Sequence, residues 1–266
     1  MKTKKIFIVA LIALILTSCA SSSYYQVYKA APTDKSTFKD SSLVYEDENC
    51  IVYYNLWDKE GGNIGFRFYN KTDTNIYLNM EGSFFVLNGI ANNYYKNRVY
   101  SNSSSSGTST TSKKTKESKS NSVDNISVQA YSVSYNEEKM ICIPPFTSKI
   151  ISEYTINNIL FRDCDIFKYP FNKKEIKTKI FTKSNSPFVF SNIIVYYVGQ
   201  SENSFEFVNE FYVTEITNYP KSEIVAEKYI SFCGHESMME KMEYFINVSP
   251  DKFYIEYEKG QDSWEH

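Results

Sequence analysis

The sequence contains few of the residue types on which most enzyme active sites depend. Only two of its 266 residues are histidines, His235 and His266, and no G-x-S-x-G, Walker, dinucleotide-binding or H-E-x-x-H motif is present. Most hydrolytic and group-transfer mechanisms need a positioned base or nucleophile. The sequence therefore favours a role without catalysis and predicts no cofactor.

Leucine and alanine are also scarce. After residue 18 the chain has five Leu and six Ala, against 21 Ile and 15 Val, and the whole chain has 23 Tyr and 19 Phe. Leucine and alanine favour helices, whereas β-branched and aromatic residues favour strands. This composition predicts a mainly β protein.

The chain also has no excess of basic side chains. The first 18 residues hold three of the 29 basic side chains, so residues 19–266 keep 26 basic and 31 acidic ones, a net charge of −5. A nucleic-acid-binding protein normally carries a basic surface, and we therefore expect no nucleic-acid partner. After residue 18 there is no apolar run of about 18 residues, so no further membrane-spanning helix is expected.

The first 18 residues have the pattern of an export signal. Three lysines precede an unbroken apolar run at 6–16, which is shorter than the roughly 20 residues of a membrane-spanning helix. The sequence L-T-S-C at 16–19 resembles the bacterial lipobox. The resemblance implies that residues 1–18 are a lipoprotein signal peptide and that Cys19 is the lipid-attachment residue, acylated with chains such as palmitate. Cleavage after Ala20 and an uncleaved anchor are the alternatives.

Four cysteines remain if Cys19 is lipidated. An even number in an exported chain permits two disulfides with three connectivities, or the thiols remain free as small apolar groups. No C-x2-C pair exists, and Cys233 and His235 are too close in sequence for a usual zinc site, so no metal site is predicted. The four residues are Cys50, Cys142, Cys164 and Cys233.

One long polar segment divides the rest of the chain. Residues 19–23 form a short tether, and 24–160 contain strand-like stretches about ten residues apart, as in a β-sandwich. Residues 101–122 include 14 Ser or Thr and no apolar residue, so this Ser/Thr/Lys-rich insertion is predicted to be disordered. Residues 161–266 are interpreted as a continuation of the sandwich or as a second β domain.

Two stretches indicate the type of sandwich. F-R-F-Y-N-K-T-D-T-N-I-Y-L at 66–78 and I-C-I-P-P-F-T-S-K-I-I at 141–151 resemble segments of bacterial immunoglobulin-like domains, in which an Asn-led turn and a proline turn join strands. The resemblance implies an antiparallel immunoglobulin-like β-sandwich, either one large sandwich or two consecutive ones. At most one short C-terminal helix is expected.

The expected helix lies at 235–246. Five apolar residues there follow a helical spacing and would form one face, although a strand is the alternative. They are Met238, Met239, Met242, Phe245 and Ile246.

Three groups of residues are candidates for chemistry. Paired carboxylates, which glycosidases use without a signature motif, occur at Glu46, Asp47 and Glu48 and at Asp163 and Asp165. Oxygen-bearing residues alternate as in a calcium loop at Asp58, Glu60 and Asn63, but the later bidentate Glu is missing. For all three groups a structural role in a turn is favoured.

The abundant aromatic residues fit a carbohydrate-binding surface as well as a stiffened sheet. On a strand, one member of each adjacent pair points inward and the other outward, and outward rings more often form cross-strand pairs. Tryptophan, the usual stacking platform, occurs only as Trp57 and Trp264. Three of the adjacent pairs are Tyr24 and Tyr25, Tyr53 and Tyr54, and Tyr94 and Tyr95.

As a whole the chain resembles uncharacterised envelope lipoproteins of Bacteroidota, which share an S-C-A-S-S anchor and an aromatic, Asn- and Lys-rich β body. No acidic residue follows Cys19 within C-A-S-S-S-Y-Y-Q-V-Y-K, and among such proteins this favours the periplasmic leaflet of the outer membrane over the cell surface. We expect a membrane-anchored envelope lipoprotein with a non-enzymatic binding or scaffolding role. Its expected partners are the lipid bilayer and an envelope protein or glycan. The alternatives are a glycan-binding or glycan-processing lipoprotein and an adhesin or fimbrial subunit.

Overall fold

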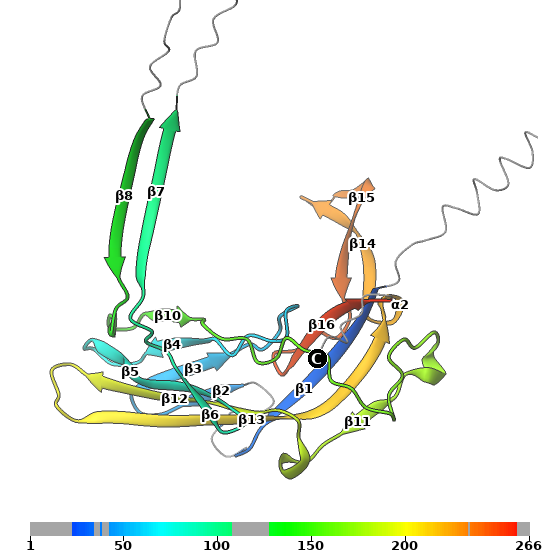
Figure 1. Ribbon diagram of the computed structural model, residues 1–266, viewed down its shortest axis with the longest axis horizontal. Helices are drawn as coiled ribbons and strands as arrows, with labels where there is room; N and C mark the ends of the chain where they lie inside the picture. Colours follow the sequence, from blue (N-terminus) through cyan, green and yellow to red (C-terminus); the bar gives the residue numbers. More distant parts are fainter. Residues whose placement is uncertain (1–22, 35–37, 39–42, 108–127, 234, 260–266) are drawn as a thin grey trace, which may run out of the picture.

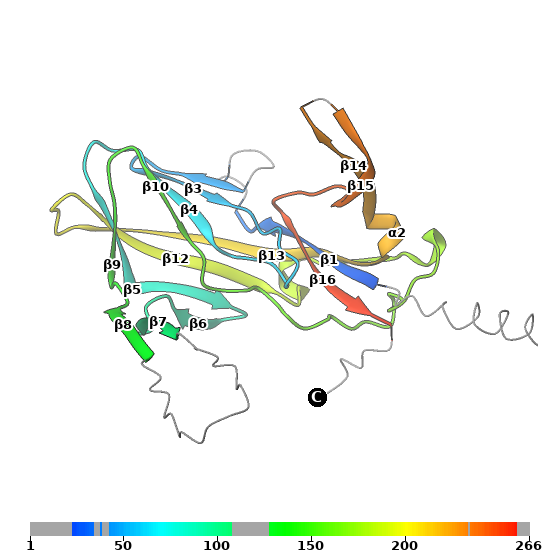
Figure 2. The same ribbon diagram turned by 90° about the horizontal axis from the view of Figure 1, so that it is seen from above.

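The computed structural model describes residues 23–34, 38, 43–107, 128–233 and 235–259. Within them the chain forms two antiparallel sheets that enclose one core, and two strand pairs project from this body (Figures 1 and 2). The predicted mainly β, antiparallel sandwich is confirmed. The one α-helix of the described residues is α2 (Lys221–Ile224). No helix in these residues has the length and apolar character needed to cross a membrane.

The larger sheet has the order β16 (Lys252–Glu258), β1 (Ser23–Pro32), β13 (Ser204–Pro220), β12 (Val189–Val198), β5 (Ile76–Leu87) and β6 (Ile90–Asn93). Two short strands join it, β11 (Thr178–Ile180) beside β13 and β9 (Met140–Ile143) beside β5. The smaller sheet has the order β10 (Ser148–Ile151), β4 (Phe66–Asn70), β3 (Cys50–Tyr54) and β2 (Val44–Glu46). Two 3-10 turns, η2 (Lys173–Glu175) and η3 (Lys183–Asn185), lie between β10 and β12.

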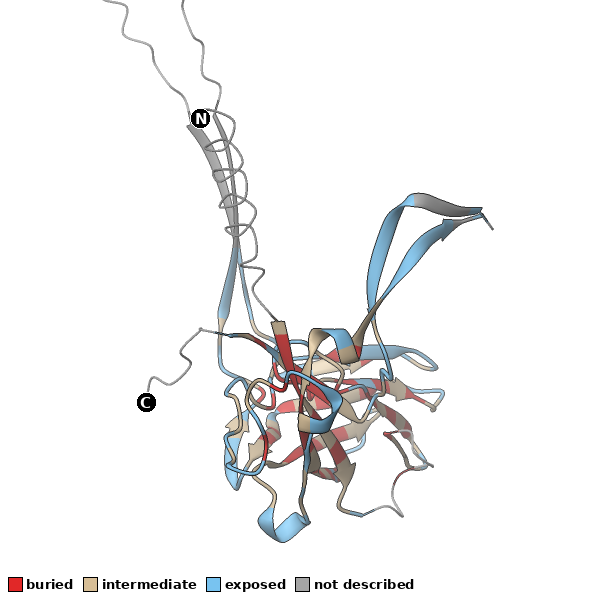
Figure 3. Cartoon of the chain, turned by 90° about the vertical axis from the view of Figure 1, so that its right-hand side faces the viewer, coloured by how far each residue is buried: buried red, intermediate tan, exposed pale blue. Residues whose placement is uncertain are grey.

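The two projecting strand pairs are β7 (Val99–Gly107) with β8 (Val128–Asn136), here called the β7–β8 ribbon, and β14 (Val225–Phe232) with β15 (His235–Phe245), here called the β14–β15 hairpin. Figures 1 and 3 show both rising from the same side of the body.

The strands follow the period-2 pattern of half-buried sheets. In β3, Cys50, Val52 and Tyr54 are buried while Ile51 and Tyr53 between them are partly exposed. Strand β13 pairs with β12 along its first half and with β1 along its second half. Strands from before and after residue 161 therefore form one sheet.

Aromatic side chains join the two sheets across the core. Phe68 of β4 meets Tyr196 of β12 with ring centroids 5.6 Å apart, and Tyr54 of β3 meets Phe211 of β13 at 5.1 Å. All four side chains are buried, and Figure 3 shows the buried residues concentrated inside the body. Edge-to-face ring pairs of this kind stabilise a core beyond the apolar area they bury.

The helix predicted at 235–246 is wrong, because this segment contains strand β15, which pairs antiparallel with β14. Phe245 packs with Tyr25 and Tyr254, so tertiary contacts and a neighbouring strand override the local helical spacing.

The predicted disorder of 101–122 is wrong for 101–107, which lie in β7. A ladder of backbone hydrogen bonds can form without apolar side chains, so the polar composition did not exclude it. Residues 108–122, the predicted signal peptide 1–18 and residues 19–22 of the predicted tether lie outside the described residues, and Ser23 belongs to β1.

Candidate functional site

A cleft of about 320 Å³ opens where the β7–β8 ribbon leaves the body. This volume lies at the lower end of the range for small-ligand sites. We call it the ribbon cleft, and its principal lining residues are Arg98, Tyr100, Tyr135, Glu137, Ile150 and Glu153.

The register of the ribbon brings these side chains together. Arg98 and Tyr100 are two residues apart and therefore point to one face, as do Tyr135 and Glu137 on the facing strand. Tyr100 lies directly opposite Tyr135, and their rings stack with centroids 5.2 Å apart. At the next position on this face, the backbone N–H of Glu137 donates to the Arg98 carbonyl oxygen at 2.8 Å.

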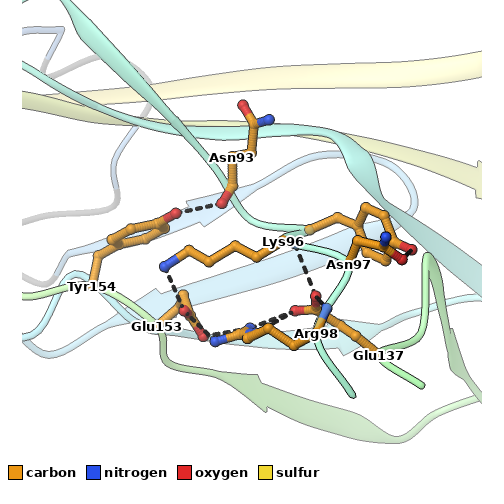
Figure 4. Close-up of polar contacts among 8 residues, drawn as sticks. Asn93, Lys96, Asn97, Arg98, Glu137, Glu153 and Tyr154 are labelled. Carbon is orange, nitrogen blue, oxygen red and sulfur yellow. Dashed lines mark hydrogen bonds and ion pairs between the residues drawn. The ribbon is translucent and has the colours of Figure 1, made fainter. Parts of the chain in front are cut away.

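The Arg98 guanidinium bridges two carboxylates (Figure 4). Its Nε donates to Glu137 Oε1 at 3.1 Å, and its Nη1 and Nη2 donate to the two oxygens of Glu153 at 2.7 and 3.0 Å. Lys96 Nζ lies 2.8 Å from Glu153 Oε1. Forked arginine–carboxylate pairs of this kind fix the orientation of both partners.

Tyr154 fixes this cluster to the core. Its ring stacks on Phe85 at 5.0 Å and meets Tyr94 edge-on at 5.4 Å, and its hydroxyl donates to the Asn93 carbonyl oxygen (Figure 4). Lys96 Nζ lies 4.5 Å from the centroid of the Tyr154 ring. Tyr154 therefore connects the base of the ribbon to the core.

The ion pairs keep both carboxylates charged. Partial burial raises the pKa of Glu137, but hydrogen bonds from the Arg98 side chain and from the backbone N–H groups of Arg98 and Lys96 outweigh it and lower that pKa to about 2. Burial likewise opposes ionisation of Glu153, and Arg98 and Lys96 lower its pKa overall.

The lowered pKa values of Glu137 and Glu153 bear on whether this pair could catalyse glycoside hydrolysis. The general acid of a glycosidase needs a raised pKa so that it is protonated near neutral pH. Both Glu137 and Glu153 are shifted the opposite way. The lowered pKa values of this pair do not fit the general acid of a glycosidase.

The ribbon cleft instead combines features that suit a binding surface. Tyr100 is 37% exposed, Tyr135 53% and Ile150 73%, so aromatic and aliphatic surface is accessible beside fixed charges. Aromatic rings with a polar rim hold ligands by stacking on apolar faces while the charged groups accept or donate hydrogen bonds.

The first group of predicted carboxylates lies in a turn. Asp47 accepts hydrogen bonds from the N–H groups of Asn49 and Cys50 at 2.8 and 2.7 Å, and Tyr196 donates to it at 2.8 Å. Glu46 pairs with Lys71 at 2.7 Å. These contacts hold the turn from β2 to β3, in which Glu48 lies.

The second group shares one lysine. Lys179 Nζ lies 3.2 Å from Asp163 and also contacts Asp165. The backbone N–H of Asp165 is the main cause that lowers the pKa of Asp163. Both carboxylates therefore act as ion-pair partners on the surface.

The residues of the calcium-loop pattern also stabilise turns. Asp58 accepts from the Glu60 N–H at 2.7 Å, and Asn63 accepts from the Gly65 N–H at 2.7 Å. No group of three or more His, Cys, Asp or Glu suited to a metal ion occurs among the described residues.

Two of the three tyrosine pairs alternate as predicted. Tyr54 and Tyr94 are buried, whereas Tyr53 and Tyr95 are partly exposed. Tyr53 is stacked by Arg67 at 4.2 Å, so one face of its ring is occupied.

The prediction fails for the pair Tyr24 and Tyr25, which are both buried. Tyr24 stacks on Tyr257 at 5.6 Å, and Tyr25 contacts Phe245 and Tyr254 on the other face of β1. The alternation rule assumes one exposed face, and here both faces of β1 are covered.

The remaining candidates are dispersed. Trp57 packs against Phe245 and Tyr254 at 5.4 and 5.2 Å, and His235 is exposed at the start of β15. Trp264 and His266, like Cys19, lie outside the described residues. All four described cysteines are free thiols: Cys50, Cys142, Cys164 and Cys233.

The residues of the ribbon cleft were missed at the sequence level. The alternation of Arg98 with Tyr100 and of Tyr135 with Glu137 was visible on either side of the Ser-rich segment. Glu153 is 55 residues from Arg98, and only the folded register brings it close.

Comparison with protein-family models, with curated proteins and with solved structures gives no match for this chain. Function is therefore inferred from its own residues and geometry.

Proposed function

We propose that the protein is a lipid-anchored envelope lipoprotein whose β body binds or scaffolds another envelope component without chemical turnover. The anchor is Cys19, and the membrane is the outer membrane, with the body in the periplasm. The lipobox resemblance at 16–19 supports the anchor. Strand β1 begins at Ser23, four residues later, so the body lies within about 14 Å of the acylated residue.

The observation that carries the binding role is the pair of projecting two-stranded elements. In the described part of the chain, the β7–β8 ribbon and the β14–β15 hairpin are each sheets of two strands. Strands at a sheet edge present backbone N–H and C=O groups to a partner, and exposed apolar side chains mark interaction sites. Tyr100 and Tyr135 provide such side chains at the base of the ribbon.

Site-specific photo-crosslinking in growing cells tests this role. A benzophenone amino acid replaces Tyr135 in the ribbon cleft, and the matched control replaces Ile180, which is 74% exposed on β11. We expect an adduct of discrete mass from position 135 and none from position 180. The absence of any adduct at 135 would contradict a stable envelope partner.

A second candidate, glycan binding, is favoured by the exposed tyrosine stack beside the Arg98, Glu137 and Glu153 charges. If this is the role, the purified chain binds at least one member of a broad glycan panel. Tyr135→Ala then weakens that binding by up to about tenfold, since ring stacking is worth roughly 0.5–1.5 kcal/mol, while Ile180→Ser leaves it unchanged. Failure to bind any glycan of the panel would exclude this candidate.

A further inference from the structure

The β14–β15 hairpin is fixed to the start of the body. Phe245, the last residue of β15, meets Tyr25 of β1 with ring centroids 5.3 Å apart and Tyr254 of β16 at 4.5 Å. Ile224 of α2 joins the same buried cluster, and Trp57 packs at its edge. The base of the hairpin is therefore held next to the first residues of β1.

One face of the hairpin is polar beyond its base. Val225 lies opposite Phe245, and the next position outward on that face pairs Glu227 with Glu243. Ion pairs offset these two charges: Lys241 lies 2.9 Å from Glu227 and Lys221 2.6 Å from Glu243. Tyr229 belongs to this face, where the Lys241 ammonium lies 5.4 Å from its ring centroid.

The opposite face carries a stripe of apolar side chains. In the regular ladder, which runs as far as Tyr229, strand alternation places Ala226, Tyr244 and Met242 on it. Tyr244 is 45% exposed and Met242 56%. Lys228 stands opposite Met242, and a lysine can bury its aliphatic stem while its ammonium reaches a polar headgroup. The hairpin is thus amphipathic across its thickness.

The short tether determines what lies near this stripe. If Cys19 is acylated, as the proposed function requires, the four residues to Ser23 span at most about 14 Å. The eight residues of β14 extend for about 26 Å. The hairpin starts beside β1 and is longer than the chain that separates β1 from the lipid, so the bilayer surface lies within its reach.

We propose that the apolar face of the β14–β15 hairpin, made of Met242 and Tyr244, rests in the lipid interface as a second attachment beside the acylated Cys19. Amphipathic elements bind a bilayer by burying their apolar face at the headgroup boundary while their charged face stays in water. A contact of this kind adds to the membrane affinity that the acyl chains on Cys19 supply. The hairpin would also fix the orientation of the body on the membrane.

Two tyrosines on opposite faces provide a matched test. Tyr244→Trp and Tyr229→Trp are both conservative, and the two side chains have similar exposures of 45% and 42%. Each acylated full chain is reconstituted into phosphatidylethanolamine and phosphatidylglycerol vesicles that contain brominated acyl chains, which quench tryptophan on contact. The emission of the parent chain, which contains Trp57 and Trp264, is subtracted.

We expect the tryptophan of Tyr244→Trp to be quenched at least about twofold more than that of Tyr229→Trp. Flotation and intact mass of the same samples report the anchor separately. Chains that carry the acyl mass and float with vesicles, but show equal or no quenching at the two positions, would overturn the hairpin proposal alone. A chain that neither carries the acyl mass nor floats would overturn the anchor, and the hairpin proposal with it.

Discussion

Tyr25 and Phe245 meet edge to face, with ring centroids 5.3 Å apart and ring planes at 89°. This contact joins the third residue of β1 to the last residue of β15, although the two are far apart in the sequence. The Tyr25 hydroxyl also donates to Glu256 of β16 at 3.0 Å. The direction in which the β14–β15 hairpin leaves the body is therefore set at strand β1.

Replacing Arg98 tests the charge cluster at the base of the β7–β8 ribbon. The pKa of Glu137 is lowered from 4.5 to about 2 in the folded chain, so its ionisation stabilises the fold above about pH 4.5 and this contribution is lost as the pH falls from 4.5 towards 2. Because the Arg98 side chain is 35% exposed, solvent screening reduces the effect, and Arg98→Ala should lower the free energy of unfolding by about 1–2 kcal/mol at pH 7.

Urea denaturation at pH 7 and pH 3 checks this, with Arg98→Lys as the control that keeps the charge but not the fork. The decrease in the free energy of unfolding caused by Arg98→Ala should be smaller at pH 3 than at pH 7. At pH 7 the decrease caused by Arg98→Lys should be smaller than that caused by Arg98→Ala. An equal loss for Arg98→Ala at both pH values would show that the ion pairs do not stabilise the ribbon base.

A buried asparagine connects the two sides of the core. Tyr94 donates its hydroxyl hydrogen to Asn192 Oδ1 at 2.8 Å, and Asn192 Nδ2 donates to the Ile64 carbonyl oxygen at 3.1 Å. Asn192→Leu leaves both partners buried without these bonds, so the free energy of unfolding should fall by about 2–3 kcal/mol. Asn93→Leu, at an exposed position, should change it by less than about 0.5 kcal/mol. Equal effects of the two substitutions in thermal or urea unfolding would refute this role.

Substitutions at two glycines distinguish the cost of backbone strain from the cost of a steric clash. Both have positive φ, +94° at Gly61 and +81° at Gly89. An added Cβ at Gly61 would lie 1.4 Å from the Asn157 carbonyl oxygen, whereas nothing lies within 4 Å at Gly89. Gly89→Ala should therefore lower the free energy of unfolding by about 1 kcal/mol, and Gly61→Ala by at least about 3 kcal/mol. Urea midpoints at unchanged slope measure both, and a smaller loss for Gly61→Ala would contradict the close approach of these two chain segments.

The free thiols differ in accessibility. Cys50 is fully buried, and burial is the main cause that raises the pKa of its thiol, while Cys164 and Cys233 are exposed. Maleimide should label Cys164 and Cys233 in the native chain and reach Cys50 only after unfolding, because the reactive species is the thiolate. Mass spectrometry of labelled peptides gives the order. Peptides linked by a disulfide between any two of the four cysteines would contradict the free thiols seen in the structure.

The sequence predicted the body of the fold through its local patterns. The strand-like stretches predicted within 24–160 include β3, in which buried and partly exposed residues alternate. The strand prediction holds there because one face of each strand is buried, which requires apolar residues at every second position.

The predictions failed where distant contacts decide the structure. Phe245 and Met242 have helical spacing but form a strand, because β14 and Tyr25 supply the partners. Arg98 and Glu153 form a site only after β10 has paired with β4 and brought residue 153 to the ribbon base. No local pattern encodes such a juxtaposition.

The proposed function depends most directly on the acylation of Cys19. Growing cells that express the full chain are fed an alkyne-tagged fatty acid, and the tag is detected on the purified protein and on its Cys19→Ala and Cys164→Ala variants. We expect a tagged parent chain, an equally tagged Cys164→Ala variant and an untagged Cys19→Ala variant. An untagged parent chain, or a tag that persists in Cys19→Ala, would contradict acylation at Cys19.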